Sequence, residues 1–533
     1  MFKLAHRAVT RLDRVTSDGP PPAGRLGQIA TKLGFPYFCP ARGRGEIGRR
    51  CRLKIGFPWS AGSSPAVRTT LTALALAGCD RATETGPIRV VAIGPRPTLT
   101  DPVRRPLPTP SRLLVDAVAQ GLVRFDATGQ VEPGLAERWI VTDGGQSYIF
   151  RLQQARWPDG RPVTTAQVAT RLRRLTTRSP LSPFLTAVDE IVAMTPEVVE
   201  VRLSRPRPDL LKLFAQPELA LLRPGGPGGT GPMVATSQDQ AVVLRPRPDP
   251  DLSGPSEPAR QVRLSGARAS LGLARFIAGQ ADVVTGGTFA DWPLVAAAAP
   301  PTATVRVDPA AGLFGLRIVR RDGFLAAPER RAAVAQAIDR AAIVAAAPGW
   351  SAEERLLPDR LDSASLPQAP SWTALLMAQR RAEARAIVAA WSKPVTLRIA
   401  LPEGPGATML WGRLAAGLLS IGITPERVGA TAPAELRLLD LVAPYDSARW
   451  YLAQMCQPCG GAALSAILAA RDAPTTAERA ERIAQADAAL TADVAFIPLA
   501  RPFRWSVVAP RVTGWQANVR AWHPLNRLVA ATN

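Results

Sequence analysis

Residues 121–168 place turn, strand and helix signals in the order that most constrains the fold of this chain. Short segments rich in β-branched and aromatic residues are separated by the pairs Thr128-Gly129, Asp143-Gly144 and Asp159-Gly160. Such pairs favour tight turns, so the segments are predicted to form β-hairpins. Thr165 follows Pro162 and is a suitable N-cap for a helix from Ala166 onward. The run therefore predicts a small β-rich subdomain that leads into a helix, and we expect these residues to fold the chain rather than to touch a ligand.

The length and composition predict a large protein of more than one domain. A chain of 533 residues with 47% hydrophobic content can bury an extensive core and should divide into two or more domains. No apolar stretch approaches the roughly 18 to 20 residues that a membrane-spanning helix needs. We therefore expect the body of the protein to be soluble.

The net charge of +22 is unevenly distributed. Residues 1–79 carry 13 Lys and Arg against 3 Asp and Glu, so +10 belongs to this segment and +12 to the remainder. A basic chain suggests nucleic acid or an anionic surface as a partner. Beyond residue 79, however, the basic residues are nearly all Arg, scattered among Pro and Ala without long runs. We interpret them as a solvated surface that reflects genome composition, with a mild preference for anionic ligands as the alternative, and predict no nucleic-acid partner.

Residues 121–168 resemble the family 5 extracellular solute-binding proteins, the dipeptide, oligopeptide and nickel receptors that feed ABC importers. The resemblance recurs in order along the chain, in residues 229–232, 276–283, 331–340, 497–499, 507–515 and 523–525. It covers approximately Ile88 to Leu528 and is poorest between Gly349 and Trp372. The resemblance implies an α/β, two-lobed periplasmic-binding-protein fold of type II, with an extra β-rich subdomain in the first lobe.

The N-terminal segment contains a bacterial lipobox, Leu76-Ala77-Gly78-Cys79, with Arg68 ahead of the apolar residues 71–77. Small residues before the cysteine admit the signal peptidase, so Cys79 is predicted to become a lipidated N-terminus. An accidental apolar run before a cysteine is the alternative. Asp80 resembles the signal that keeps lipoproteins at the inner membrane. We assign residues 1–66 to a non-native or disordered basic extension, 67–79 to the lipoprotein signal and 80–110 to a Pro-rich tether.

The family resemblance divides the rest of the chain between two lobes. The first lobe is expected to comprise residues 88–300 and 497–533, and the second residues 302–494. The chain would then cross between the lobes twice, as a hinged clamp requires.

Local patterns support an α/β second lobe. Residues 395–401 alternate as a strand, residues 407–419 are helical in pattern, and residues 423–428 form another strand. This spacing favours parallel strands joined by a helix. Thr475-Thr-Ala-Glu478 is a capping box that predicts a helix to about Leu490.

Histidine is too scarce for most hydrolytic chemistry. His6 and His523 are the two histidines, and His6 precedes the predicted cleavage site. A Ser-His-Asp or Cys-His site would have to use His523, which stands in a sequence similar to the structural C-terminus of the family. Zinc catalysis with several histidine ligands is excluded. We predict a binding protein with no catalytic residue, no metal site and no cofactor.

Cys456-Gln-Pro-Cys459 is the most distinctive local motif of the second lobe. In an oxidising periplasm two cysteines at this spacing most simply form a disulfide. A redox-active pair and a metal site of two thiols remain as alternatives, although Gly460-Gly461 follows where a redox pair would precede a helix.

The segment from Asp440 to Tyr451 occupies the place of a Trp-x-Ala-Asp-Tyr segment whose aspartate, in peptide-binding members of the family, pairs with the ligand ammonium. Pro444 stands at that aspartate, so the usual salt bridge is in doubt; Asp446 is a possible substitute, and Arg449 could hold a ligand carboxylate or neutralise Asp446. A solvated loop is the alternative. The candidate ligand-binding residues are Asp440, Tyr445, Asp446, Arg449, Trp450, Arg504 and Trp505.

Together these features predict the substrate-binding component of an ABC importer. It would bind a peptide or peptide-like solute in the periplasm by hinge closure and deliver it to permease and ATPase subunits, while a lipid anchor holds it at the inner membrane. A cytoplasmic transcription regulator with a solute-binding domain is the alternative, supported by the basic residues 1–79 but lacking helix-turn-helix periodicity there. A carboxylate-dependent hydrolase is a third possibility for which no motif argues.

Overall fold

A computed structural model describes residues 86–223, 226, 228–247, 258–359 and 361–530. The predicted basic extension, the lipoprotein signal with Cys79, and His6 lie outside these residues. The chain divides into two units between Gly78 and Cys79, and the description below concerns the second unit alone. Within the described part, no helix combines the length and apolar character that crossing a bilayer demands.

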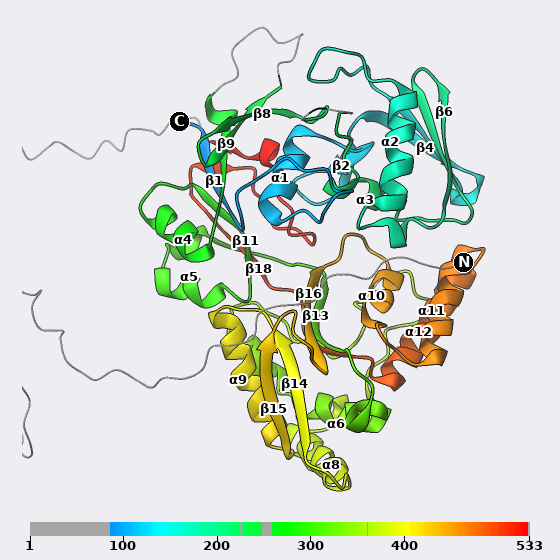
Figure 1. The fold of residues 1–533 in the computed structure, drawn as a ribbon, viewed down its shortest axis with the longest axis vertical. Helices are drawn as coiled ribbons and strands as arrows, with labels where there is room; N and C mark the ends of the chain where they lie inside the picture. Colours follow the sequence, from blue (N-terminus) through cyan, green and yellow to red (C-terminus); the bar gives the residue numbers. More distant parts are fainter. Residues whose placement is uncertain (1–85, 224–225, 227, 248–257, 360, 531–533) are drawn as a thin grey trace, which may run out of the picture. The chain divides into compact units, whose positions relative to one another are not determined.

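The first lobe is built on a mixed seven-stranded sheet (Figure 1). Its central strands β1, β10 and β11 run parallel, as in an α/β fold, and β9 and β18 pair with β10 and β11 in the antiparallel sense. In spatial order the strands are β12 (Val305–Asp308), β18 (Arg504–Val508), β11 (Val283–Thr288), β1 (Ile88–Ile93), β10 (Val262–Ala267), β9 (Ala241–Pro246) and β8 (Met233–Gln238).

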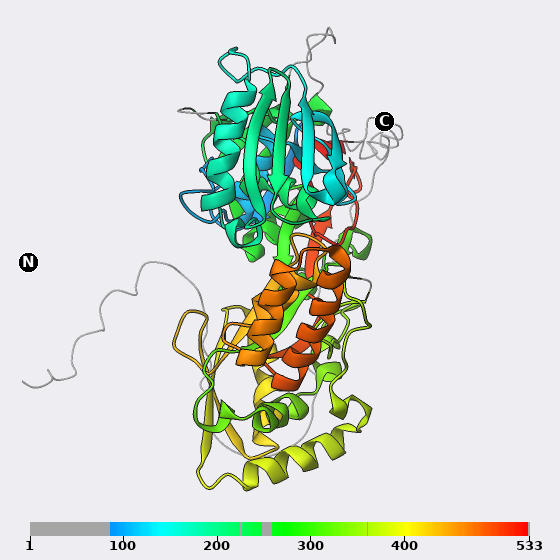
Figure 2. The same cartoon turned by 90° about the vertical axis from the view of Figure 1, so that its right-hand side faces the viewer.

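The β-rich subdomain predicted from residues 121–168 is present in the first lobe. Strand β2 (Val123–Phe125) forms an antiparallel pair with β3 (Val131–Pro133) across the predicted Thr-Gly turn, in which Gly129 has a φ of +79°. A separate four-stranded sheet has the order β4 (Ala136–Thr142), β5 (Ser147–Leu152), β7 (Val198–Leu203) and β6 (Val188–Thr195), and α2 (Thr165–Arg178) packs on it (Figure 2).

The N-cap of α2 differs from the prediction by one residue. Thr164, not Thr165, accepts a hydrogen bond from the backbone N–H of Gln167, and the Gln167 side chain accepts one from the backbone of Thr164. This reciprocal capping box uses a glutamine three residues after the cap, which satisfies two free helix N–H groups at once. Thr165 instead begins the helix.

The second lobe contains a five-stranded sheet. The predicted strand, helix and strand are observed as β14 (Val395–Leu401), α9 (Pro405–Leu419) and β15 (Ile423–Gly429), with β14 and β15 parallel. The sheet is completed beyond β14 by β16 (Leu436–Val442), β13 (Gly312–Ile318) and β17 (Phe496–Ala500). One half of the predicted capping box is present, because the Thr475 side chain accepts from the Glu478 N–H at the start of α12 (Thr476–Asp493).

Sheet membership moves the two crossings between the lobes by several residues from their predicted places. Strand β12, at 305–308, belongs to the first-lobe sheet although it was assigned to the second lobe, and β17, at 496–500, belongs to the second-lobe sheet. The chain therefore crosses at residues 309–311 and 501–503. Strand pairing decides these boundaries, and pairing is not visible in a local pattern.

The helices are distributed over both lobes. The first lobe contains, besides α2, the helices α1 (Thr109–Val118), α3 (Leu210–Phe214), α4 (Ala269–Ile277) and α5 (Trp292–Ala298). The second contains, besides α9 and α12, the helices α6 (Pro328–Ala337), α7 (Arg340–Val344), α8 (Met377–Ala389), α10 (Ala448–Met455) and α11 (Gly461–Asp472). The segment Gly229-Thr-Gly-Pro232 runs against the end of α1, where a Cβ on Gly231 would lie 2.4 Å from the Ala119 nitrogen. Only glycine permits this approach.

Candidate functional site

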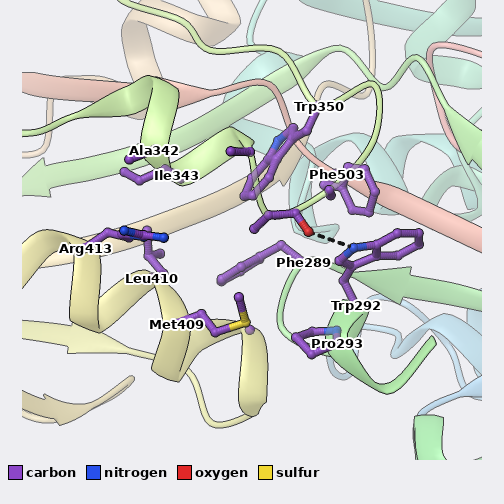
Figure 3. A pocket seen from close by; sticks show the side chains of 14 residues that line it. Phe289, Trp292, Pro293, Ala342, Ile343, Trp350, Met409, Leu410, Arg413 and Phe503 are labelled. Carbon is purple, nitrogen blue, oxygen red and sulfur yellow. Dashed lines mark hydrogen bonds between the residues drawn. The ribbon is translucent and has the colours of Figure 1, made fainter. Parts of the chain in front are cut away.

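A pocket of about 200 Å³ lies where the two lobes meet. Phe289 and Trp292 come from the first lobe, Trp350 and Met409 from the second, and Phe503 from the second crossing (Figure 3). We call this site the aromatic pocket. Its volume is below the roughly 300 to 1,000 Å³ of sites that enclose a whole drug-sized ligand. It therefore suits one apolar group of a larger solute.

The aromatic walls pack against one another in tilted and edge-on contacts. The ring centroids of Trp350 and Phe503 are 5.5 Å apart, and those of Trp292 and Phe503 are 5.0 Å apart. Phe289 lies 6.3 Å from Trp350. Separations of about 4.5 to 7 Å with tilted planes are favourable for aromatic pairs. The walls of the pocket are thus pre-formed by mutual packing.

Both indole N–H groups of the pocket donate hydrogen bonds to backbone carbonyls. Trp292 Nε1 donates to the Ala346 carbonyl at 3.1 Å, and Trp350 Nε1 donates to the Arg501 carbonyl at 2.7 Å (Figure 3 shows the first bond). The faces of the two rings are therefore free to meet apolar groups, while their polar edges are already bonded. Trp292 also ties the first lobe to the second at this point.

Glycine allows the lobes to approach closely beside the pocket. The N–H of Gly406, in the first turn of α9, donates to the Ala290 carbonyl at 2.9 Å. A Cβ on Gly406 would lie 1.9 Å from the Phe289 carbonyl oxygen. Any larger residue at this position would push the two walls of the pocket apart.

Arg413 is the charged side chain of the pocket lining. It lies on the opposite side of the pocket from Trp292 (Figure 3), is exposed, and pairs with no described carboxylate. A guanidinium near aromatic faces can bind a carboxylate or stack on a ring. The arrangement suits a solute with an apolar group for the pocket and an anionic or aromatic group beside it.

The structure places the predicted residues Asp440, Arg504 and Trp505 near the crossings but outside the aromatic pocket. Arg504 Nη1 donates to Asp440 Oδ1 at 2.8 Å, which joins β18 of the first lobe to β16 of the second. Burial raises the pKa of Asp440 against the opposing effect of Arg504. Trp505 is 1% exposed, and its Nε1 donates to the Thr288 carbonyl. These contacts are internal to the protein, and their proposed role toward a ligand stays a prediction.

Asp446 is held by cations of the first lobe. Lys212 Nζ lies 2.6 Å from Asp446 Oδ2, and Arg520 Nη2 lies 2.5 Å from Oδ1. Burial would raise the pKa of Asp446, but Arg520 and Lys212 outweigh it and lower the pKa. The local sequence suggested Arg449 as a partner for Asp446, but the structure gives Asp446 two others, Lys212 and Arg520, from distant segments. In this structure Asp446 is therefore not free to receive a ligand ammonium.

Tyr445, Arg449 and Trp450 are buried at the contact between the lobes, again outside the aromatic pocket. The Tyr445 ring lies 6.0 Å from Phe184 of the first lobe, and Trp450 lies 5.0 Å from Tyr451 in an edge-on contact. Arg449 is 4% exposed. Trp450 thus contributes to the core rather than to an open surface.

The cysteine pair and His523 make contacts within the protein that stabilise the fold. Cys456 and Cys459 are joined as a disulfide between α10 and α11, with their Cα atoms 4.7 Å apart. His523 is buried, lies 3.1 Å from Asp308 Oδ2, and stacks on Trp515. Among the residues that the structure describes, no three His, Cys, Asp or Glu side chains gather as they would around a metal ion.

Sequence reasoning missed the aromatic pocket. Its walls come from separate segments, and Trp350 falls in the stretch that matches the family least well. Phe503 immediately precedes Arg504 and Trp505, which were singled out. The one available signal was this concentration of large side chains at the second crossing.

Comparison with known proteins identifies the family. Residues 130–390, just under half of the chain, match the model described as bacterial extracellular solute-binding proteins, family 5 Middle. A segment of 89 residues is 37% identical to the probable deoxycholate-binding periplasmic protein YgiS of Escherichia coli and covers 16% of each chain. A segment of 122 residues is 29% identical to the periplasmic oligopeptide-binding protein OppA of Salmonella typhimurium and covers 19% of this chain and 22% of the relative. The alignments thus span about a fifth or less of these relatives.

Solved structures extend the likeness of the fold over most of the chain. The Haemophilus influenzae OppA complex with RPPGFSPFR has a TM-score of 0.71 at 18% identity, covering 83% of this chain and 99% of that one. The Escherichia coli murein tripeptide binding protein MppA gives 0.70 at 16%, and Campylobacter jejuni NikZ with Ni(L-His) gives 0.68 at 16%, each covering 84% of this chain and 99% of the other. At such identities the likeness concerns the fold. Residues 130–390 thus match the bacterial extracellular solute-binding proteins of family 5, and the chain has a two-lobed α/β fold like that of the solved structures.

Proposed function

We propose that this protein is the solute-binding component of an ABC importer, which takes up a peptide or peptide-like solute between its lobes and delivers it to a permease. The observation that carries the proposal is the aromatic pocket, whose walls come from both lobes and from the second crossing. A group that fills this pocket contacts both lobes at once, so binding favours their closure. No covalent step is needed for this function.

The chemistry of the pocket supports a solute with an apolar side chain. The lining is aromatic and aliphatic, and Arg413 is its charged residue. Peptides and bile-acid-like molecules both combine apolar groups with a carboxylate. A peptide with an aromatic or branched aliphatic side chain fits a space of about 200 Å³ better than a whole rigid steroid does.

Mass spectrometry of solute that copurifies with the full chain tests the proposal. We expect a peptide-like molecule that is released on unfolding and rebinds to the emptied protein. Phe289→Ala should weaken rebinding, whereas Phe324→Ala, which removes a buried aromatic residue of the second lobe away from the pocket, should not. Equal loss in both variants, or no bound solute from cells grown on peptides, would refute a peptide-binding role.

The lipobox supports a proposal for the cellular location of the protein. With Cys79 lipidated by two acyl chains the protein would be anchored stably in the periplasm. Palmitate labelling and membrane fractionation of the protein, compared with Cys79→Ala, test this. Labelling that persists in Cys79→Ala would contradict the anchor. The alternative of a transcription regulator is not favoured, because the matched proteins are named as solute-binding proteins.

A further inference from the structure

Arg207, Arg449 and Arg479 form a second charged feature at the contact between the lobes, which we call the arginine cluster. Arg207 precedes α3 in the first lobe, whereas Arg449 lies in α10 and Arg479 in α12 of the second. Their exposed fractions are 8%, 4% and 5%. None of these residues lines the aromatic pocket. Three guanidinium groups are thus withdrawn from water on a different part of the interface.

Most donors of the arginine cluster lack a hydrogen-bond partner among the described residues. Nε and Nη2 of both Arg207 and Arg449 are inaccessible and unbonded, as is Nη1 of Arg479. Of the three, Arg479 alone has a carboxylate partner among the described residues: its Nη2 lies 2.6 Å from Asp362 Oδ2 and 2.8 Å from Ser447 Oγ. Buried charged donors are normally paired, because an unpaired donor loses its hydrogen bonds to water and gains none from the protein.

The charges around Arg207 and Arg449 are of the same sign. Burial, and then the charges of Arg449 and Arg479, lower the pKa of Arg207 to about 9. Burial also lowers the pKa of Arg449, with Arg479 and Arg205 acting in the same direction. The opposing group near both is the Tyr445 hydroxyl, which is neutral at pH 7; burial raises its pKa further, to about 12. Arg479 is paired with Asp362, whereas neither Arg207 nor Arg449 forms an ion pair with a described carboxylate.

The nearby acids do not pair with Arg207 or Arg449. Asp472 pairs with Arg471 and Arg205, and Asp209 is a buried acid whose pKa burial raises to about 6. Asp446 pairs with Lys212 and Arg520, and Asp362 accepts from the Ala448 N–H as well as from Arg479. An anion from outside the chain would complete the cluster.

We propose that the arginine cluster binds a small oxyanion, a carboxylate or phosphate group, between the two lobes. The guanidinium fork matches such groups and donates two bonds to one of them. Because Arg207 and Arg449 come from opposite lobes, the anion enters when the lobes separate and is enclosed when they meet. It then removes the repulsion that opposes closure. The inference rests on the proposed function only for the hinge motion, since an oxyanion can bind whether or not a permease receives the solute.

Calorimetric titration of the full chain with inorganic phosphate, at constant ionic strength, tests the proposal. We expect saturable binding that Arg449→Gln weakens by at least about tenfold, as loss of a charge-assisted pair predicts. Arg178→Gln, which removes an exposed arginine of α2, should bind phosphate as the wild type does. If Arg449→Gln fails to fold, Arg449→Lys keeps the charge but loses the fork, and it should still bind more weakly than the wild type.

Competition identifies the source of the anion. If phosphate displaces the copurified solute, the site holds the solute's own anionic group; if both bind together, the site takes a free anion, and either result supports the cluster. Absence of phosphate binding, or equal weakening in Arg449→Gln and Arg178→Gln, would overturn the proposal. If neither the wild type nor Arg449→Gln binds phosphate, yet both bind and import the solute, the proposed anion site is overturned and the proposed function stays intact.

Discussion

The two lobes meet through an apolar contact at the aromatic pocket and through a charged contact at the arginine cluster. In Figure 1 α5 and α9, which carry the pocket, lie to the left of β18 and β13, and α3 and α10 lie to their right. At the pocket every indole N–H is bonded, whereas at the cluster several guanidinium donors are not. The pocket is complete without any added group, and the cluster is not.

This difference suggests separate roles for the two contacts, one in solute affinity and one in the response of lobe closure to ions and pH. Aromatic contacts contribute about 0.5 to 1.5 kcal/mol per pair beyond their buried area and are insensitive to salt. Ion pairs near the surface contribute about 0 to 1 kcal/mol and weaken as salt rises. We therefore expect the pocket to supply most of the solute affinity, and the charged contact to set how closure responds to ions and pH.

Asp487→Asn has the largest expected effect and tests the pH response of a buried acid in the second lobe. Asp487 lies in α12, which also carries Arg479, and its Oδ2 accepts from the Gln368 N–H at 2.7 Å. Burial raises its pKa from the ordinary 3.8 to about 6 against the effects of this bond and of Arg355. Between these values the folded state binds more protons than the unfolded state, so this group's contribution to stability is lost as pH rises.

The asparagine variant has no such titration. Relative to the wild type, its free energy of unfolding should rise by about 2 to 3 kcal/mol between pH 4 and pH 7, as a pKa difference of about two units requires. Denaturant unfolding at a series of pH values measures this. A difference between the two proteins that is independent of pH would show that Asp487 is ionised normally in the folded state.

Trp350→Ala tests the apolar side. The ring lies 5.2 Å from Phe314 and 5.5 Å from Phe503 and forms one wall of the pocket. Removal of a central aromatic anchor typically costs about 2 kcal/mol of binding, so solute affinity should fall about thirtyfold. Calorimetry with the copurified solute gives the value, and the loss should be the same in low and high salt.

Trp391→Ala is the matched control for this change. Trp391 is partly buried and packs against Phe324 and Arg330 in the second lobe, outside the pocket. Its removal should lower stability and leave solute affinity unchanged. If Trp391→Ala weakened binding as much as Trp350→Ala, general destabilisation would explain both losses. The aromatic pocket would then not be the source of the solute affinity.

Local sequence patterns predicted the elements but not the contacts between distant segments. The strand, helix and strand from Val395 to Gly429 were predictable because periodicity and length are local properties. The pairing of β12 and β17 with sheets of opposite lobes was not, because it depends on partners far along the chain. For the same reason the partners of Asp446 were missed: Lys212 is 234 residues from Asp446.

Asp446→Asn tests the direct attraction between the lobes on the charged side and should have the smallest effect. The change removes the charge that Lys212 and Arg520 share, but the carboxylate is 39% exposed and solvent screens it. We expect a loss of about 1 kcal/mol in the free energy of closure, seen as about fivefold weaker solute binding at low salt. The loss should shrink as salt rises, unlike that of Trp350→Ala. Glu190→Gln breaks an exposed ion pair with Arg202 inside the first lobe and should not alter solute binding. Calorimetry at two salt concentrations compares the variants, and a salt-independent loss in Asp446→Asn would mean that the charged contact acts through packing, as the aromatic pocket does.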